Sequence, residues 1–137
     1  MKQIRNVSGI LLYNDNKEIL LQHRDENTTI LPGYWSFFGG AIDENETPED
    51  TIRRETKEEL EYELTNPKLV MIQKFDTEIH NITRYVYIEK YNPDIKLVLR
   101  EGRGMDWHKC SAVEKLKIDK FDLEVIKFVE KIINKNL

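Results

Sequence analysis

The segment from Gly40 to Tyr62, GAIDENETPEDTIRRETKEELEY, most strongly constrains this chain of 137 residues, because it combines seven glutamates with clear helix signals. Thr47 precedes Pro48, and Asp50 follows three residues after the threonine. These residues are an N-cap, the favoured first-turn proline and the reciprocal acid of a capping box. The sequence therefore predicts a helix over residues 48–60.

Two faces of this predicted helix carry different chemistry. At about 100° per residue, Ile52, Thr56 and Leu60 align on one packing stripe. Another face carries three carboxylates: Glu55, Glu58 and Glu59. Neighbouring carboxylates repel one another by a few tenths of a kcal/mol per pair. Either nearby basic residues balance a solvated face, or the carboxylates bind a divalent cation, since hard cations such as Mg²⁺ take oxygen ligands.

The spacing of the charged residues favours the cation site. Five residues separate Gly40 from Glu46, and seven more lead to the pair Arg54-Glu55. With the later glutamates, this order resembles the Nudix box, G-x5-E-x7-R-E-U-x-E-E-x-G-U, in which U is a bulky aliphatic residue. By this resemblance the chain is identified as a member of the Nudix family, with Gly40 and Glu46 as structural positions of the motif.

Three positions depart from the family pattern. Thr56 stands where an aliphatic residue is usual but keeps a β-branched shape, so we expect a modest effect. Glu61 replaces the final glycine. Because a helix-ending glycine commonly adopts positive φ and glutamate does so reluctantly, the turn after the helix is expected to differ. Phe38, in YWSFFGG, occupies a place where family members often have proline.

The resemblance implies a reaction and its cofactor. Nudix enzymes typically hydrolyse a nucleoside diphosphate linked to another moiety, using water to cut the pyrophosphate. It implies Mg²⁺, with Mn²⁺ as a substitute, held by Glu58 and Glu59. Glu55 is a further metal ligand or the base that acts on the water, and Gly39 would offer its backbone carbonyl to the metal.

Two further residues receive catalytic assignments from the resemblance. REGRGMDW is similar to the EGxxxEW stretch of MutT-type members, which makes Glu101 the competing candidate for general base; an ordinary surface-loop glutamate is the alternative. Arg54 is expected to orient Glu55 and to pair with Glu46, because a planar guanidinium matches carboxylates better than lysine does.

Substrate contacts are assigned to two residues before the box. Arg24 stands where family members often place a basic contact to phosphate, although an exposed arginine at a strand end is an equally ordinary interpretation. Trp35 is the candidate for stacking on a base. Aromatic residues in a strand that enters the box, such as Phe37 and Phe38, more often belong to a core.

The rest of the sequence predicts an α/β (α+β) fold with a mixed sheet between helices. Predicted strands are two around the turn NDNK in residues 7–24, a short one within residues 29–40, and others over residues 68–79, 81–91 and 104–110. A final helix over residues 119–135 has an apolar stripe of Phe121, Val125, Phe128 and Ile132. The resemblance, which covers roughly residues 5–115, implies an α/β/α sandwich, and we expect one domain over residues 1–137.

Composition limits the partners. No apolar run approaches the ~18 residues that a membrane span needs, and a net charge of −4 argues against binding extended nucleic acid. The single cysteine, Cys110, fits a reducing cytoplasm. Family members often form homodimers.

Three functions are compatible with these residues. The stretch REGRGMDW favours a MutT-like hydrolase whose small nucleotide substrates are (d)NTPs. The alternative is a hydrolase of NDP-sugars or related metabolites. The alternative of another class is a non-catalytic nucleotide-sensing module, which would be expected to lose acids from the box.

Overall fold

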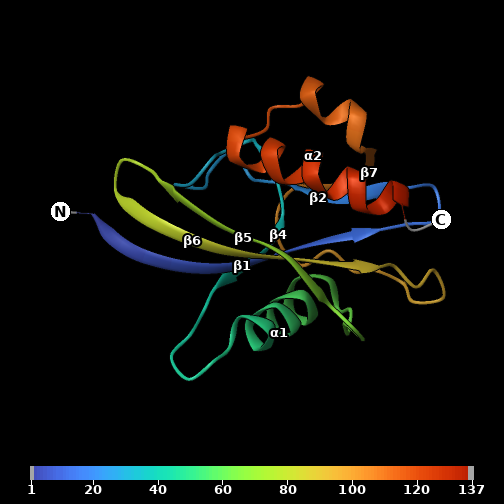
Figure 1. The fold of residues 1–137 in the computed structure, drawn as a ribbon, viewed down its shortest axis with the longest axis horizontal. Coiled ribbons are helices and arrows are strands. Elements are labelled where there is room, and N and C mark those ends of the chain that lie inside the picture. The colour runs from blue at the N-terminus through green and yellow to red at the C-terminus, as the bar shows by residue number, and fades with distance from the viewer. Residues whose placement is uncertain (1, 136–137) are drawn as a thin grey trace.

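The computed structural model describes residues 2–135 and consists of a mixed sheet between two helices (Figure 1). Helix α1 (Pro48–Leu60) covers one face of the sheet, and helix α2 (Lys120–Lys135) covers the other. This arrangement confirms the predicted α/β sandwich.

Seven strands form the sheet within the described residues. They are β1 (Gln3–Tyr13), β2 (Glu18–His23), β3 (Trp35–Ser36), β4 (Phe38–Ala41), β5 (Lys68–Asp76), β6 (His80–Lys90) and β7 (Gly104–Lys109). The order is β3-β2-β1-β6-β5, with β4 pairing with β1 and β7 with β2. Among the strand pairs of residues 2–135, β1 and β6 are parallel and the other pairs are antiparallel. A 3₁₀ helix, η1 (Cys110–Lys115), precedes α2.

The strongest local predictions are confirmed. Strands β1 and β2 flank the turn NDNK, and α1 spans the predicted residues 48–60. Thr47 Oγ1 accepts a hydrogen bond from the backbone N–H of Asp50 at 3.0 Å, and the Asp50 carboxylate accepts from that of Thr47 at 3.1 Å. The capping box read from the sequence is therefore formed.

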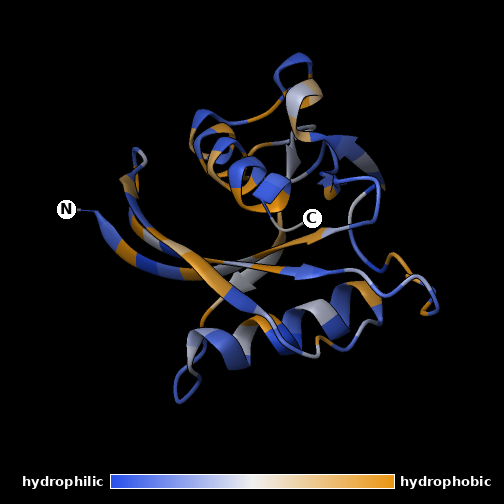
Figure 2. Cartoon of the chain, turned by 45° about the vertical axis from the view of Figure 1, so that its right-hand side comes forward, coloured by the Kyte–Doolittle hydropathy of each residue, from blue (hydrophilic) through white to orange (hydrophobic). Residues whose placement is uncertain are grey.

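The sheet separates two apolar cores, because successive side chains on a strand point to opposite faces. Leu11 packs in the core under α2, whereas Ile10 and Leu12 pack in the core under α1. Figure 2 shows the apolar residues of α2 turned toward the sheet. Ile52 and Leu60 of the predicted packing stripe are fully buried in the core under α1.

The predicted stripe of α2 is partly wrong. Val125 is buried, but Phe128 is 41% exposed. The buried residues of α2 are Asp122, Val125, Ile126, Val129 and Ile133. This helix has apolar residues on more of its surface than the sheet can contact. The way the helix docks on the sheet therefore decides which apolar residues are buried, and the periodicity of the sequence does not. One consequence is a buried acid, Asp122, that the pattern did not predict.

The entrance to the box also differs in detail from the prediction. Two short strands, β3 and β4, replace the single one expected in residues 29–40. In residues 2–135 no helix has the length and apolar character needed to cross a bilayer.

Candidate active site

Arg54 and Glu46 form a clamp at the start of the site. Arg54 Nε lies 2.7 Å from Glu46 Oε2, and Arg54 Nη2 lies 2.9 Å from Glu46 Oε1. Thr51 Oγ1 donates a further hydrogen bond to Glu46 at 2.8 Å. Arg54 first, and then Thr51, lower the pKa of Glu46 to about 2. Glu46 is therefore ionised and fixed in orientation.

The third arm of Arg54 reaches the carboxylates of α1. Its Nη1 lies 3.1 Å from Glu55 Oε1 and 3.4 Å from Glu58 Oε2. Burial raises the pKa of Glu55, and the contact with Arg54 opposes this rise. A Cβ atom added to Gly40 would lie 2.5 Å from Glu55 Oε1. Glycine at this position therefore makes room for the Glu55 carboxylate.

Glu59 is the most buried acid of the site, with 5% of its surface exposed. Its Oε1 accepts a hydrogen bond from the backbone N–H of Gly39 at 2.9 Å. Burial, a contact with the Glu101 carboxyl and the charge of Glu55 raise the pKa of Glu59 to about 9, whereas the Gly39 N–H opposes the rise. The contact seen at Gly39 is through its N–H, and a metal contact through its carbonyl stays a prediction.

Glu101 reaches this cluster because the loop that carries it lies against the end of α1. The backbone N–H of Arg100 donates to the carbonyl of Glu59 at 2.8 Å. On the other side, Gln22 Nε2 donates to the carbonyl of Glu101 at 3.1 Å. The structure thus brings the loop glutamate to the helix carboxylates, as the sequence comparison with MutT-type members implied.

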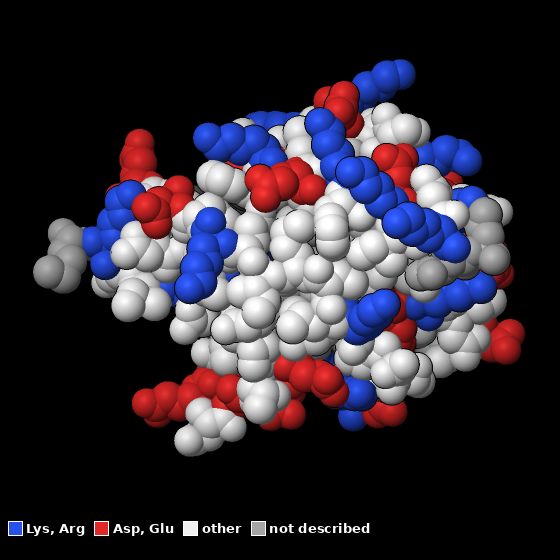
Figure 3. All heavy atoms as spheres, in the orientation of Figure 1, with Lys and Arg blue, Asp and Glu red and all other residues white. Residues whose placement is uncertain are grey.

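Four carboxylates, those of Glu55, Glu58, Glu59 and Glu101, consequently gather at one end of the sheet, and Figure 3 shows acidic side chains along the edge where α1 lies. Burial raises the pKa of Glu55 and of Glu59. Four carboxylates gathered in this way suit a hard divalent cation, whose charge would offset their repulsion. In residues 2–135 no three acidic, histidine or cysteine side chains are arranged as a formed metal site. Arg54 contacts Glu55 and Glu58, and the Gly39 N–H binds Glu59, so a metal ion would have to replace these partners of the carboxylates.

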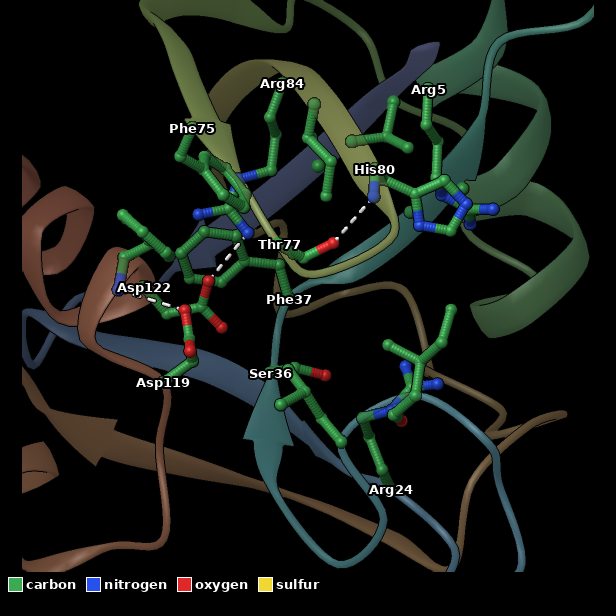
Figure 4. Close-up of a pocket in the computed structure, with 18 of the residues that line it drawn as sticks. Arg5, Arg24, Ser36, Phe37, Phe75, Thr77, His80, Arg84, Asp119 and Asp122 are labelled. Atoms are coloured by element: carbon green, nitrogen blue, oxygen red, sulfur yellow. Dashed lines mark hydrogen bonds and ion pairs between the residues drawn. The ribbon is translucent and has the colours of Figure 1, made fainter. Parts of the chain in front are cut away.

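A cavity of about 480 Å³ lies beside the carboxylate cluster, because Gly39 and Gly40, which adjoin Glu59 and Glu55, are part of its wall. Figure 4 shows other residues that border this cavity, among them Phe37 and Phe75. Arg24 also lines it, and its Nε donates to the carbonyl of Ile30 at 2.9 Å. Phe37 and Phe38 belong to the two cores, as expected, and also border the cavity.

Trp35 does not line this cavity. Its ring stacks on His23 with centroids 4.3 Å apart, and the edge of His108 approaches it at 4.8 Å. The structure therefore brings Arg24, and not Trp35, to the space beside the glycines.

The sequence patterns did not identify several residues that line the cavity. They are Arg5 on β1, Ser36 on β3, Phe75 on β5, Arg84 on β6 and Asp122 on α2. Each of these residues comes from a different element, so no local spacing in the sequence links them. The one feature that could have indicated the cavity was Asp122, an acid inside the apolar pattern of the last helix.

Comparison with known proteins decides the family, because the NUDIX domain model matches residues 2–129. This protein belongs to the NUDIX domain family.

Individual relatives are more distant. An 8-oxo-dGTP diphosphatase of Proteus vulgaris is 28% identical over 82 residues, which are 60% of this chain and 71% of that protein. Nucleoside triphosphatase NudI of Escherichia fergusonii is 36% identical over 56 residues, 41% of this chain and 39% of that one. A MutT protein from Methanosarcina mazei Go1 has the same fold, with a TM-score of 0.83, 19% identity and coverage of 98% of both chains.

This Nudix protein accommodates its two departures within the box in different ways. Glu61 has φ 53° and ψ 38°, so glutamate itself adopts the left-handed conformation that glycine usually supplies. Its carboxylate pairs with Arg100, beside the loop that carries Glu101. Thr56 is fully buried, and its hydroxyl has no hydrogen-bond partner within residues 2–135. The turn thus keeps its left-handed residue, whereas the threonine leaves a buried polar atom unpaired.

Proposed function

We propose that this Nudix hydrolase is a Mg²⁺-dependent pyrophosphohydrolase of nucleoside triphosphates. The observation that carries the proposal is the double role of Gly39 and Gly40. Gly39 binds Glu59 and Gly40 contacts Glu55, while both glycines line the cavity. A ligand whose nucleoside occupies the cavity would therefore place its phosphates beside the carboxylate cluster.

The size and charge of the cavity support a nucleotide. Protein pockets that bind small molecules commonly have volumes of about 300–1,000 Å³. The cavity described here has a volume of about 480 Å³. Arg5 and Arg24 supply positive charge on its wall. Arginine presents several donors to phosphate oxygens, which suits it to hold a triphosphate chain.

In this proposal the glutamates have different chemical roles. Glu58 and Glu59 would hold the metal, which when bound offsets the charge of the phosphates and acidifies a water molecule. Glu55 is the favoured general base, because its pKa is raised and Arg54 orients it. Glu101 is the competing base or a further ligand, and Arg54 acts as a positioning residue.

The names of the relatives support a triphosphate substrate. Both the 8-oxo-dGTP diphosphatase and NudI are named for nucleoside triphosphate substrates. No contact in the cavity specifically favours an NDP-sugar. The box acids are all present, which argues against a module that only senses nucleotides. A cytoplasmic location is inferred from the lone buried Cys110, and a homodimer stays a prediction.

The first experiment incubates the purified protein with Mg²⁺ and a panel of (d)NTPs, 8-oxo-dGTP, NDP-sugars and ADP-ribose, and measures the phosphate or pyrophosphate released. Glu58→Gln should abolish turnover, whereas the matched Glu49→Gln, at an exposed ion pair with Arg53 on the same helix, should retain it. Hydrolysis confined to NDP-sugars would replace the proposed substrate class. Silence across the panel, with nucleotide binding still measurable, would favour the sensing module.

A second comparison separates the two candidate bases. Glu55→Gln should lower kcat by about 100-fold or more, as loss of a general base does, and remove the acidic limb of the pH profile. Mg²⁺-induced thermal stabilisation identifies any loss of metal binding. The same signature in Glu101→Gln, with a normal Glu55→Gln profile, would transfer the role of base to Glu101.

A further inference from the structure

Gln22 is a buried polar residue that follows three apolar residues of β2. Ile19, Leu20 and Leu21 are buried in the two cores, and Gln22 itself has only 4% of its surface exposed. Side chains two residues apart on a strand point to the same face, and Leu20 packs in the core under α1. Gln22 is therefore directed toward the α1 side of the sheet, where the carboxylate cluster lies.

The loop between β6 and β7 carries Glu101, and its first anchors lie on α1. The backbone N–H of Val98 donates to the carbonyl of Leu60 at 2.9 Å, and that of Arg100 donates to the carbonyl of Glu59 at 2.8 Å. These two hydrogen bonds hold the loop against the C-terminal end of α1 as far as the residue before Glu101.

From Glu101 onward the same loop is held by β2. Gln22 Nε2 donates to the carbonyl of Glu101 at 3.1 Å, and the backbone N–H of Arg103 donates to the carbonyl of His23 at 3.0 Å. Gly102, between these two anchors, has φ 87°, and an added Cβ would lie 2.9 Å from Gln22 Nε2. The backbone of the loop thus packs directly on the amide of Gln22.

Packing of the strand gives no reason for an amide at this position. Burying an amide costs free energy unless it is hydrogen-bonded, and an apolar side chain would continue the apolar run of β2 without that cost. The hydrogen bond from Gln22 also fixes a direction, because hydrogen bonds weaken steeply when they are misaligned. The carbonyl that it fixes belongs to Glu101, the residue whose carboxyl contacts Glu59.

We propose that Gln22 is a positioning residue that holds the Glu101 carboxyl at the carboxylate cluster by fixing the backbone of Glu101. The proposal rests on the function proposed above, and it applies whether Glu101 acts as a base or as a further metal ligand. Gln22 does not line the cavity. Its effect on turnover should therefore depend on the presence of the Glu101 carboxyl.

The test is a double-mutant cycle of Gln22→Met and Glu101→Gln, with kcat/KM measured for whichever substrate of the panel is hydrolysed. Methionine has about the length of glutamine but lacks the N–H donor. Gln22→Met alone should lower kcat/KM by about 10- to 100-fold, because a small displacement of a catalytic group can cost that much. The double variant should be as active as Glu101→Gln, because residues that act through one another are not additive.

Two results of the cycle would overturn the proposal. One is a double variant in which the two losses multiply, and the other is a Glu101→Gln variant with the kcat/KM of the wild-type protein. Leu21→Met is the matched control, because Leu21 adjoins Gln22 in β2 but packs in the core under α2. It should keep the wild-type kcat/KM. An equal loss in Leu21→Met would show that any disturbance of β2 lowers turnover, and would contradict a role of the amide.

Amide hydrogen exchange in the metal-free protein measures the position of the loop without turnover. In Gln22→Met the backbone N–H groups of Arg100 and Arg103 should exchange about tenfold faster or more, because the loop opens locally when an anchor is lost. The N–H of Val98, which is bound to α1, should keep its protection and serves as the internal control.

Failure of the proposed function is distinguishable from failure of this proposal. If no substrate of the panel is hydrolysed but exchange at Arg100 and Arg103 accelerates as expected, the proposed function fails and Gln22 still positions the loop. Unchanged exchange at these two residues would overturn the role of Gln22, whatever the activity of the protein.

Discussion

Arg54 holds Glu46 through two hydrogen bonds, 2.7 Å from Nε to Oε2 and 2.9 Å from Nη2 to Oε1. The same guanidinium extends Nη1 to Glu55 at 3.1 Å. The geometry links the loop before α1 to a carboxylate of the candidate site, because one rigid planar group contacts both.

Arg54→Lys should lower turnover with little change in fold. Lysine carries the charge but cannot contact Glu46 and Glu55 with a planar fork, so we expect kcat to fall by about 10- to 100-fold through misplacement of Glu55. Steady-state kinetics and thermal melting measure the two effects. Arg53→Lys, on the same helix but directed to Glu49, serves as the matched control. If the Arg54→Lys variant has the turnover of the wild-type protein, Arg54 does not position Glu55 for catalysis.

Gly40→Ala should displace the Glu55 carboxylate. The added Cβ would lie 2.5 Å from Glu55 Oε1, the end of a flexible side chain that can move aside. We therefore expect a small change in Tm and a fall in kcat of about tenfold or more. At Gly104 a Cβ would have no neighbour closer than 3.9 Å, so Gly104→Ala is the control. Full activity in Gly40→Ala would show that the position of Glu55 does not limit turnover.

Glu59 predicts a specific dependence of stability on pH. Its pKa rises from the ordinary 4.5 to about 9 on folding, so between these values the folded protein keeps a proton that the unfolded chain has released. The contribution of Glu59 to stability is thus greatest below pH 4.5 and is lost as pH rises toward 9.

Thermal melting in EDTA from pH 5 to pH 9 measures this effect. The Tm of the wild-type protein relative to Glu59→Gln, which cannot ionise, should decline as pH rises. Mg²⁺ should reverse the decline in the wild-type protein and act more weakly on the variant. A difference in Tm that does not change with pH would contradict the raised pKa.

Glu61→Gly should stabilise the protein. A residue with a side chain in the left-handed conformation costs about 1–2 kcal/mol, and the exposed pair with Arg100 returns about 0–1 kcal/mol. We expect Tm to rise by about 2–5 °C for a chain of this size, with turnover unchanged. Glu61→Ala, which loses the pair but keeps the left-handed backbone, should melt below the wild-type protein. A Glu61→Gly variant with a lower Tm would mean that the pair outweighs the strain.

Features that depend on a few consecutive residues were predictable from the sequence. The cap at Thr47, the bounds of α1 and the shared face of Glu55, Glu58 and Glu59 follow from helix geometry, which repeats every few residues. The resemblance of the box to the Nudix motif likewise implied that Arg54 and Glu46 would meet. These contacts needed no knowledge of how the strands pair.

Contacts between distant elements were decided only by the tertiary structure. Glu101 reaches Glu59 because the loop before β7 hydrogen-bonds to the end of α1, and Asp122 reaches Arg84 because α2 docks across β6. In the same way Phe128 is exposed although it continues an apolar stripe. The sequence by itself determined the helix that presents the acids. Tertiary packing decided what faces those acids, because burial and pairing between remote segments depend on the docked surfaces and not on local backbone periodicity.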